Sequence, residues 1–128
     1  MKLEDICVSL AMAKRLKEAG WPQDYNSICE WVVMGEDSHI ALGVNLPMIA
    51  ITGREYICAP TASEILDRLP EKEPGEQCKS VGSFLVVTPL QGKWKVSYEE
   101  DGVGHIGTVG DTLATAAAAM WLHLTKTL

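Results

Sequence analysis

The clearest pattern of apolar and polar positions lies in the last third of the chain. Three β-favouring runs and one alanine-rich segment follow one another there: 83–87, 93–98, 103–109 and 111–127. In the second run, Trp94, Val96 and Tyr98 alternate with polar residues, as in a strand that has one solvent-exposed face. This order predicts a three-stranded antiparallel meander that is covered by a C-terminal helix.

Local signals add detail to this predicted unit. Phe84–Val87 is continuously apolar, which predicts a central strand covered on both faces. Turn-forming sequences at Pro89–Gly92 and Glu100–Gly102 separate the three strands. Asp111 is a good N-cap and is expected to begin the last helix. The small side chains of Ala116–Ala119 are expected to let the backbone of that helix approach the sheet closely.

The start of the chain predicts an amphipathic helix. Its apolar positions recur at steps of three and four residues: Leu3, Ile6, Cys7, Leu10, Ala13 and Leu16. Gly20 is placed to take the left-handed conformation just past the end of this helix, and Pro22 prevents the helix from continuing. Trp21 is then expected to fold back onto the last turn.

The middle of the chain predicts a hairpin and a short helix. Residues 28–34 and 39–44 are β-favouring, and the four residues between them fit a hairpin loop. Thr61–Glu64 has the spacing of a capping box, which predicts a helix that Pro70 ends. Charged residues with a proline and a glycine occupy 71–79, a predicted solvated loop.

At 128 residues the chain has the length of one ordinary domain. We therefore predict a single α+β domain over residues 1–128, in which an antiparallel sheet packs with N-terminal, short central and C-terminal helices. Its hydrophobic content of 47% is that of a globular protein, so wholesale disorder is not expected. The net charge of −6 counts against sequence-independent nucleic-acid binding, because phosphate backbones repel an acidic surface.

The sequence also bears on location. No apolar stretch approaches the roughly 20 residues that cross a bilayer. The first residues lack the basic and apolar regions of a signal peptide. We therefore predict a cytoplasmic protein that has no membrane partner.

The cysteines do not predict a metal site. Cys7, Cys29, Cys58 and Cys78 are widely scattered and lack the close pairs that zinc sites use. In a reducing compartment they are expected to be thiols, either buried or idle at the surface.

The candidate acid–base groups are three histidines: His39, His105 and His123. His105 lies near Asp101, so an Asp–His pair is conceivable, but no motif supplies a nucleophile. The glycines at 102, 104 and 107 match a dinucleotide fingerprint only by letter, because they fall within a strand and its turn. A turn, a bulge or a close helix approach explains them better. We predict no catalytic residue, no cofactor and no metal, and leave the binding residues undetermined.

Three further segments carry a resemblance that covers most of the chain: Ala13–Gln23, Ala59–Pro70 and Gly110–Leu122. Their order resembles small proteins of bacteriophages and prophages, including those grouped as phage ABA-sandwich domains. The resemblance implies helices layered with a sheet and no assigned enzymatic role. No functional residue carries over, since these segments describe capped helices and not a site.

Residues 83–123 are also similar to the antitoxin half of HicA/HicB modules, whose β-β-β-α unit binds a toxin. The family has Glu-Glu-Ala after the helix start, whereas this chain has Ala114–Ala116. The order from Thr61 onward resembles double-stranded-RNA-binding domains as well. Those domains need lysines at the start of the last helix, where this chain has Asp111 and Thr112, so RNA binding is not expected.

Together these observations predict a non-enzymatic accessory or structural protein of phage or prophage origin. It is expected to act through protein–protein contact, either with another protein or with itself as a homo-oligomer. One alternative is HicB-like toxin neutralisation or another small binding module. The other is a small hydrolase-like enzyme, which rests on Asp101 and His105 alone.

Overall fold

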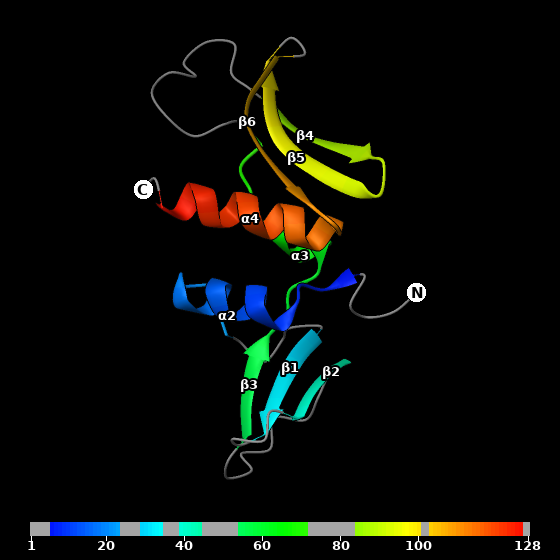
Figure 1. The fold of residues 1–128 in the computed structure, drawn as a ribbon. Helices are drawn as coiled ribbons and strands as arrows, with labels where there is room; N and C mark the ends of the chain where they lie inside the picture. Colours follow the sequence, from blue (N-terminus) through cyan, green and yellow to red (C-terminus); the bar gives the residue numbers. More distant parts are fainter. Residues whose placement is uncertain are drawn as a thin grey trace. The chain divides into compact units, whose positions relative to one another are not determined.

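A computed structural model describes most of the chain, in six ranges: 6–23, 29–34, 39–44, 54–71, 84–100 and 103–126. Contacts between residues divide the chain into two compact units, Met1–Thr61 and Ala62–Leu128, which are described one at a time. Each unit contains helix and a three-stranded antiparallel sheet, which confirms the predicted α+β class (Figure 1). The single domain over residues 1–128 stays a prediction.

The described residues of the first unit include the helix α2 and one sheet. Its elements are α2 (Leu10–Glu18), β1 (Cys29–Met34), β2 (His39–Val44) and β3 (Arg54–Cys58). The strand order is β2-β1-β3, and α2 packs against β3. The buried apolar residues of this unit come from the helix, its flanks and two of the strands: Cys7, Val8, Met12, Ala13, Leu16, Trp21, Cys29, Ile57, Cys58 and Ala59.

The predicted helix at the start of the chain is interrupted. Cys7 forms an isolated antiparallel bridge with Thr61, and α2 begins only at Leu10. Ser9 caps the helix, because its Oγ accepts a hydrogen bond of 3.2 Å from the Met12 N–H. An unbroken helix through residues 7–9 was therefore a wrong prediction. The apolar spacing is helical through these residues. The Ser9 hydroxyl nevertheless accepts from the Met12 N–H, and Cys7 pairs with Thr61 and not within a helix.

The end of α2 confirms the predicted stop. Gly20 has a φ of +103°, in the left-handed region, and its N–H donates to the Lys17 carbonyl at 3.1 Å. The Trp21 N–H donates to the Leu16 carbonyl at 2.8 Å, and the Trp21 side chain is buried. These two bonds form a Schellman motif, which satisfies the last carbonyls of the helix.

Gln23 joins the end of α2 to β3. Its Nε2 donates to the Trp21 carbonyl at 3.1 Å, and its Oε1 accepts from the Cys58 N–H at 3.0 Å. Since β3 is an edge strand, this amide occupies a backbone donor that would otherwise face outward.

The two β-favouring runs of the predicted hairpin pair with each other. β1 and β2 are antiparallel, in register from Cys29 opposite Val44 to Met34 opposite His39. The predicted four-residue loop, 35–38, lies outside the described residues, so the hairpin connection itself stays a prediction. Residues Arg54–Cys58 form the third strand of this sheet, β3, which pairs with β1.

The second unit contains the predicted meander. Its elements are α3 (Ala62–Leu66), β4 (Phe84–Leu90), β5 (Lys93–Glu100), β6 (Val103–Gly110) and α4 (Leu113–Lys126). The strand order β4-β5-β6 with antiparallel pairing confirms the meander, and the C-terminal helix packs against β5, β6 and α3. In Figure 1, α4 runs along one side of the curved sheet.

The short helix α3 ends earlier than Pro70. Its α-helical part stops at Leu66, and two further turns follow, with Arg68 N–H donating to the Ile65 carbonyl and Leu69 N–H to that of Leu66. Pro70 contributes in another way, because its carbonyl accepts a hydrogen bond of 2.7 Å from the Tyr98 hydroxyl. The predicted loop after Glu71 lies outside the described residues.

The structure corrects the position of β4. The continuous apolar run predicted a central strand, but β4 is an edge strand and β5 is central. Val96, Ser97 and Tyr98 of β5 are fully buried, whereas Phe84 is half exposed. An apolar run indicates a strand but does not determine how many neighbours the strand has.

The turn after β4 is also shorter than predicted. The strand continues through Pro89, and Leu90 pairs with Lys93 across the two residues Gln91 and Gly92. Gly92 has a φ of +68°, which a glycine adopts without steric strain because it has no Cβ. A proline is compatible with an edge strand because only one side of that strand must donate to the ladder.

A close approach fixes α4 on the sheet. The Thr108 hydroxyl donates to the Ala116 carbonyl at 2.7 Å. Gly110 lies so near the helix that an added Cβ would stand 2.6 Å from the Ala116 nitrogen. The small side chain of Ala116 permits this contact, as the alanine run predicted.

The start of α4 differs from the prediction by one residue. The helix begins at Leu113, and the Thr112 Oγ1 accepts a hydrogen bond of 3.1 Å from the Thr115 N–H. Thr112 is therefore the N-cap, and the assignment of this role to Asp111 was wrong. Both residue types cap helices well, so composition alone does not choose between neighbours.

The first prediction concerns Gly110. Gly110→Ala forces a methyl group into the backbone of α4, and we expect it to lower the free energy of unfolding by about 2 kcal/mol. Gly104→Ala is the matched control, since its Cβ would meet only Glu99 Cγ at 3.9 Å; its effect is expected to stay within about 0.5 kcal/mol. Urea unfolding followed by circular dichroism measures both. Equal midpoints for the two variants would contradict the close approach.

The second prediction concerns the cap of α4. Thr112→Ala removes the hydroxyl that accepts from Thr115, and we expect a loss of about 1 kcal/mol in unfolding free energy. Asp111→Ala removes only a charge near the helix start, which is worth a few tenths of a kcal/mol. Chemical denaturation of both variants tests the assignment, and a larger loss for Asp111→Ala would return the cap to that residue.

Candidate functional site

The pairing register divides the side chains of the β4-β5-β6 sheet between two faces. The face that packs against α4 carries Trp94, Val96 and Tyr98 from β5, with Thr108 and Gly110 from β6. The opposite face is called the far face here. Its members follow from the cross-strand partners: Phe84, Val86, Thr88, Leu90, Lys93, Lys95, Ser97, Glu99, Gly104, Gly107 and Val109.

Apolar side chains are exposed on the far face. Phe84 is 51% exposed, Leu90 43% and Val109 50%. Among the described residues, two other large apolar side chains are exposed: Val87 on the α4 face and Ile6 in the first unit. Single exposed apolar residues are ordinary, but three on one sheet face form a candidate contact surface.

Charges on the far face are ordered along β5. Lys93 and Lys95 lie toward one end of the strand and Glu99 toward the other, with Ser97 between them. Ser97 is fully buried, and its hydroxyl donates to Glu99 Oε2 at 2.6 Å. This charge-assisted bond satisfies the buried hydroxyl and fixes the carboxylate. In the described part of the chain, no carboxylate pairs with Lys95.

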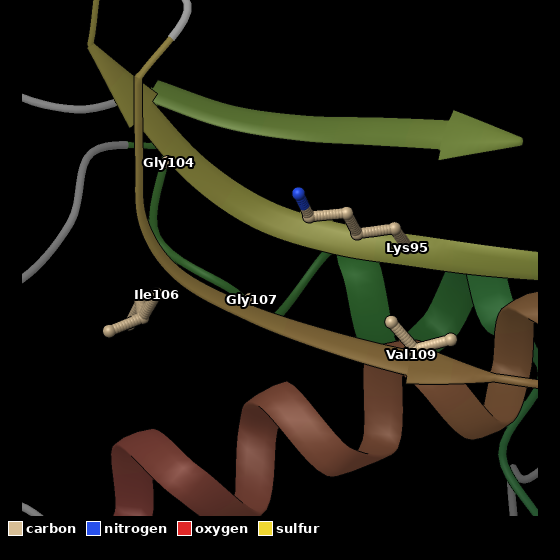
Figure 2. Close-up of a pocket in the computed structure, with 5 residues that line it drawn as sticks. All are labelled: Lys95, Gly104, Ile106, Gly107 and Val109. Carbon is tan, nitrogen blue, oxygen red and sulfur yellow. The ribbon is translucent and has the colours of Figure 1, made fainter. Parts of the chain in front are cut away.

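A hollow of about 230 Å³ lies beside these charges. Its lining residues are Lys95, Gly104, Ile106, Gly107 and Val109 (Figure 2). Lys95 and Val109 rise from neighbouring strands on the same side of the sheet, whereas Ile106 points away from them. The two glycines contribute no side chain, so β6 is bare at these positions beside the Lys95 side chain, which runs along β5.

Gly107 explains how Lys95 lies across the sheet. A Cβ added at Gly107 would stand 3.2 Å from Lys95 Cε and 3.3 Å from Ser97 Cβ. The methylene groups of Lys95 therefore cover the glycine backbone, while the ammonium group extends along the strand toward Gly104. The hollow thus combines a cationic wall with apolar walls.

A β-bulge lies at one end of the hollow. Tyr98 pairs with Ile106 and Glu99 pairs with Gly104, so His105 is the extra residue of β6. The sequence predicted that the glycines near this point accommodate a turn, a bulge or a close helix approach. A bulge is found beside Gly104, and a close helix approach is found at Gly110. The side chain of His105 and all of Asp101 lie outside the described residues, so that pair remains a prediction.

The other candidate groups do not converge in the described part of the chain. His123 is exposed on α4, and the side chain of His39 lies outside the described residues. No cluster of three or more histidine, cysteine or acidic side chains that could hold a metal is found within the described ranges. Nor is any helix of those ranges long and apolar enough to cross a membrane.

The sequence predicted a solvent-exposed face for the β5 strand, but not that apolar side chains of β4 and β6 are exposed on the same face. The signal for the far face is the spacing of Lys93, Lys95, Ser97 and Glu99 on alternate positions of β5, opposite the apolar residues of β4. That signal becomes meaningful only with the register, which shows that the exposed side chains share one face.

Three cysteines are buried thiols. Cys7, Cys29 and Cys58 are each at most 5% exposed, as expected for small apolar groups. Cys78 lies outside the described residues.

The third prediction follows from this burial. In a Cys78→Ser variant, the remaining thiols should not react with a disulfide reagent at neutral pH while the protein is folded, because the reagent cannot reach them. Three thiols should react at once in denaturant. Absorbance of the released thiolate measures both states, and rapid reaction of the folded variant would contradict the packing of the first unit.

Comparisons with protein-family models, with curated proteins and with solved structures find no match for this chain. The resemblances to phage ABA-sandwich proteins and to HicB antitoxins therefore stay expectations from the sequence. What the far face binds has to be inferred from its own residues.

Proposed function

We propose that the chain is a non-enzymatic accessory or structural protein of phage or prophage origin, located in the cytoplasm, and that it acts through protein–protein contact. The contact surface in this proposal is the far face of the β4-β5-β6 sheet. The observation that carries it is the exposure of Phe84, Leu90 and Val109 on that one face.

The chemistry of the far face favours a protein partner. Exposed apolar side chains gain free energy when a partner removes them from water, at about 25 cal/mol for each Å² that is buried. Lysine and glutamate at opposite ends of β5 add charges that orient a partner. The hollow beside Lys95 gives the surface relief, which a complementary side chain can fill.

The edges of the sheet point to the same kind of contact. Pro89 lies within the edge strand β4 and lacks a backbone N–H, while the bulge at His105 disrupts the edge strand β6. Both features hinder the addition of a further strand. A partner is therefore expected on the face of the sheet and not along its edges.

The fourth prediction tests the proposed contact. The tagged full chain is used to capture proteins from a bacterial extract that also contains an untagged copy of the chain. A Leu90→Asp, Val109→Asp double variant should no longer retain the proteins that the unaltered chain retains, because it replaces two exposed apolar side chains of the far face with charges. Ile6→Asp is the control, since Ile6 is an exposed apolar residue outside the far face and should leave capture unchanged.

Retention of the same proteins by the unaltered chain and the double variant would refute a contact through the far face. Retention of neither the untagged copy nor any other protein would refute the proposed function as a whole. Circular dichroism of each variant shows that its fold is intact.

A further inference from the structure

We infer that the far face binds a second copy of this chain, face to face, about a two-fold axis that runs between the two sheets, over Ser97 and perpendicular to β5. This inference rests on the proposed function and names its partner. In the resulting dimer the two sheets pack through their far faces, and α4 stays on the outside of each sheet. Two sheets stacked in this way lie about 10 Å apart, as in a β-sandwich.

The charge order of β5 complements itself. Lys95 lies two residues before Ser97 and Glu99 two residues after it, and all three share the far face. The two-fold axis lies in the plane between the sheets and is perpendicular to β5 above Ser97. It therefore sets the β5 strand of the second copy antiparallel to that of the first. Lys95 of each copy then faces Glu99 of the other, so that one symmetric contact contains two opposite-charge pairs.

The same symmetry brings a protruding side chain over the hollow. On β6, Val109 pairs with Lys95, and Gly104 pairs with Glu99. The operation that sets Lys95 opposite Glu99 therefore sets Val109 of one copy opposite Gly104 of the other. Val109 is half exposed, and Gly104 lines the hollow. The Val109 side chain of one copy therefore lies over Gly104 of the other, which has no side chain to exclude it.

Lys95 and Glu99 are both prepared for this contact. No carboxylate of the described residues pairs with the Lys95 ammonium, so none of these carboxylates has to be displaced by one from the partner. Glu99 is held by the Ser97 hydroxyl through one oxygen, which leaves its other oxygen for a second partner.

The fifth prediction is a charge exchange across the axis. Lys95→Glu alone sets two carboxylates against each other twice, and Glu99→Lys alone does the same with two ammonium groups. Each single variant should raise the dissociation constant of the dimer at least about a hundredfold. The Lys95→Glu, Glu99→Lys double variant restores two opposite pairs and should dimerise again. Lys14→Glu, on the exposed side of α2, is the charge-matched control and should leave the dimer intact.

Mixing the two single variants gives the sharpest readout. The Lys95→Glu copy presents only carboxylates at these positions and the Glu99→Lys copy only ammonium groups, so both pairs of a mixed dimer are favourable. Size-exclusion chromatography with light scattering should show the 13.9 kDa monomer for each variant alone and twice that mass for the mixture. Circular dichroism confirms that each variant is folded, since Glu99→Lys also loses the bond from Ser97.

A monomeric unaltered chain at tens of micromolar would overturn the inference, as would single variants that dimerise like the unaltered chain. If the chain is monomeric but captures a different protein through Leu90 and Val109, the proposed function stands and only the identity of the partner is wrong. If the chain neither dimerises nor captures a protein, both proposals fail.

Discussion

The contact between β6 and α4 determines the organisation of the second unit. Gly110 has no side chain and Thr108 donates to the Ala116 carbonyl, so the helix backbone lies directly on the strand. This contact commits α4 to one face of the sheet. Among the described residues of this unit, no comparable helix lies on the other face, where Phe84, Leu90 and Val109 are exposed.

Local patterns predicted the elements of this unit well. The alternation in β5, the turn that contains Gly92 and the alanine-rich helix are short-range signals, and each was found close to its expected position. The same holds for the end of α2, because only a glycine takes the left-handed conformation at Gly20 without strain. In these cases the physical cause lies within a few residues of its effect.

The wrong predictions concern features that depend on residues far apart in the sequence. Cys7 fits an apolar helical stripe, but its backbone pairs with Thr61, more than fifty positions away. The apolar run of β4 indicates a strand and does not reveal that only β5 lies beside it. The far face belongs to the same class, because residues of three strands share it only after the register is known. Its charge order was visible in the sequence, yet its meaning depends on Val109 and Gly104 of another strand.

The two-residue turn at Gln91 and Gly92 has a consequence for the identity of both faces. The side chains of consecutive strand residues point to opposite faces of the sheet. A shift of the pairing by one residue would therefore move the buried side chains to the solvent-exposed face and the exposed ones into the core. The Lys95 ammonium would be buried beneath α4, and the Trp94 indole would be turned to water in its place. A tight connection tolerates no such slip, because it has no spare residue to absorb the offset. This two-residue turn therefore keeps Trp94 on the face that packs against α4 and Lys95 on the far face.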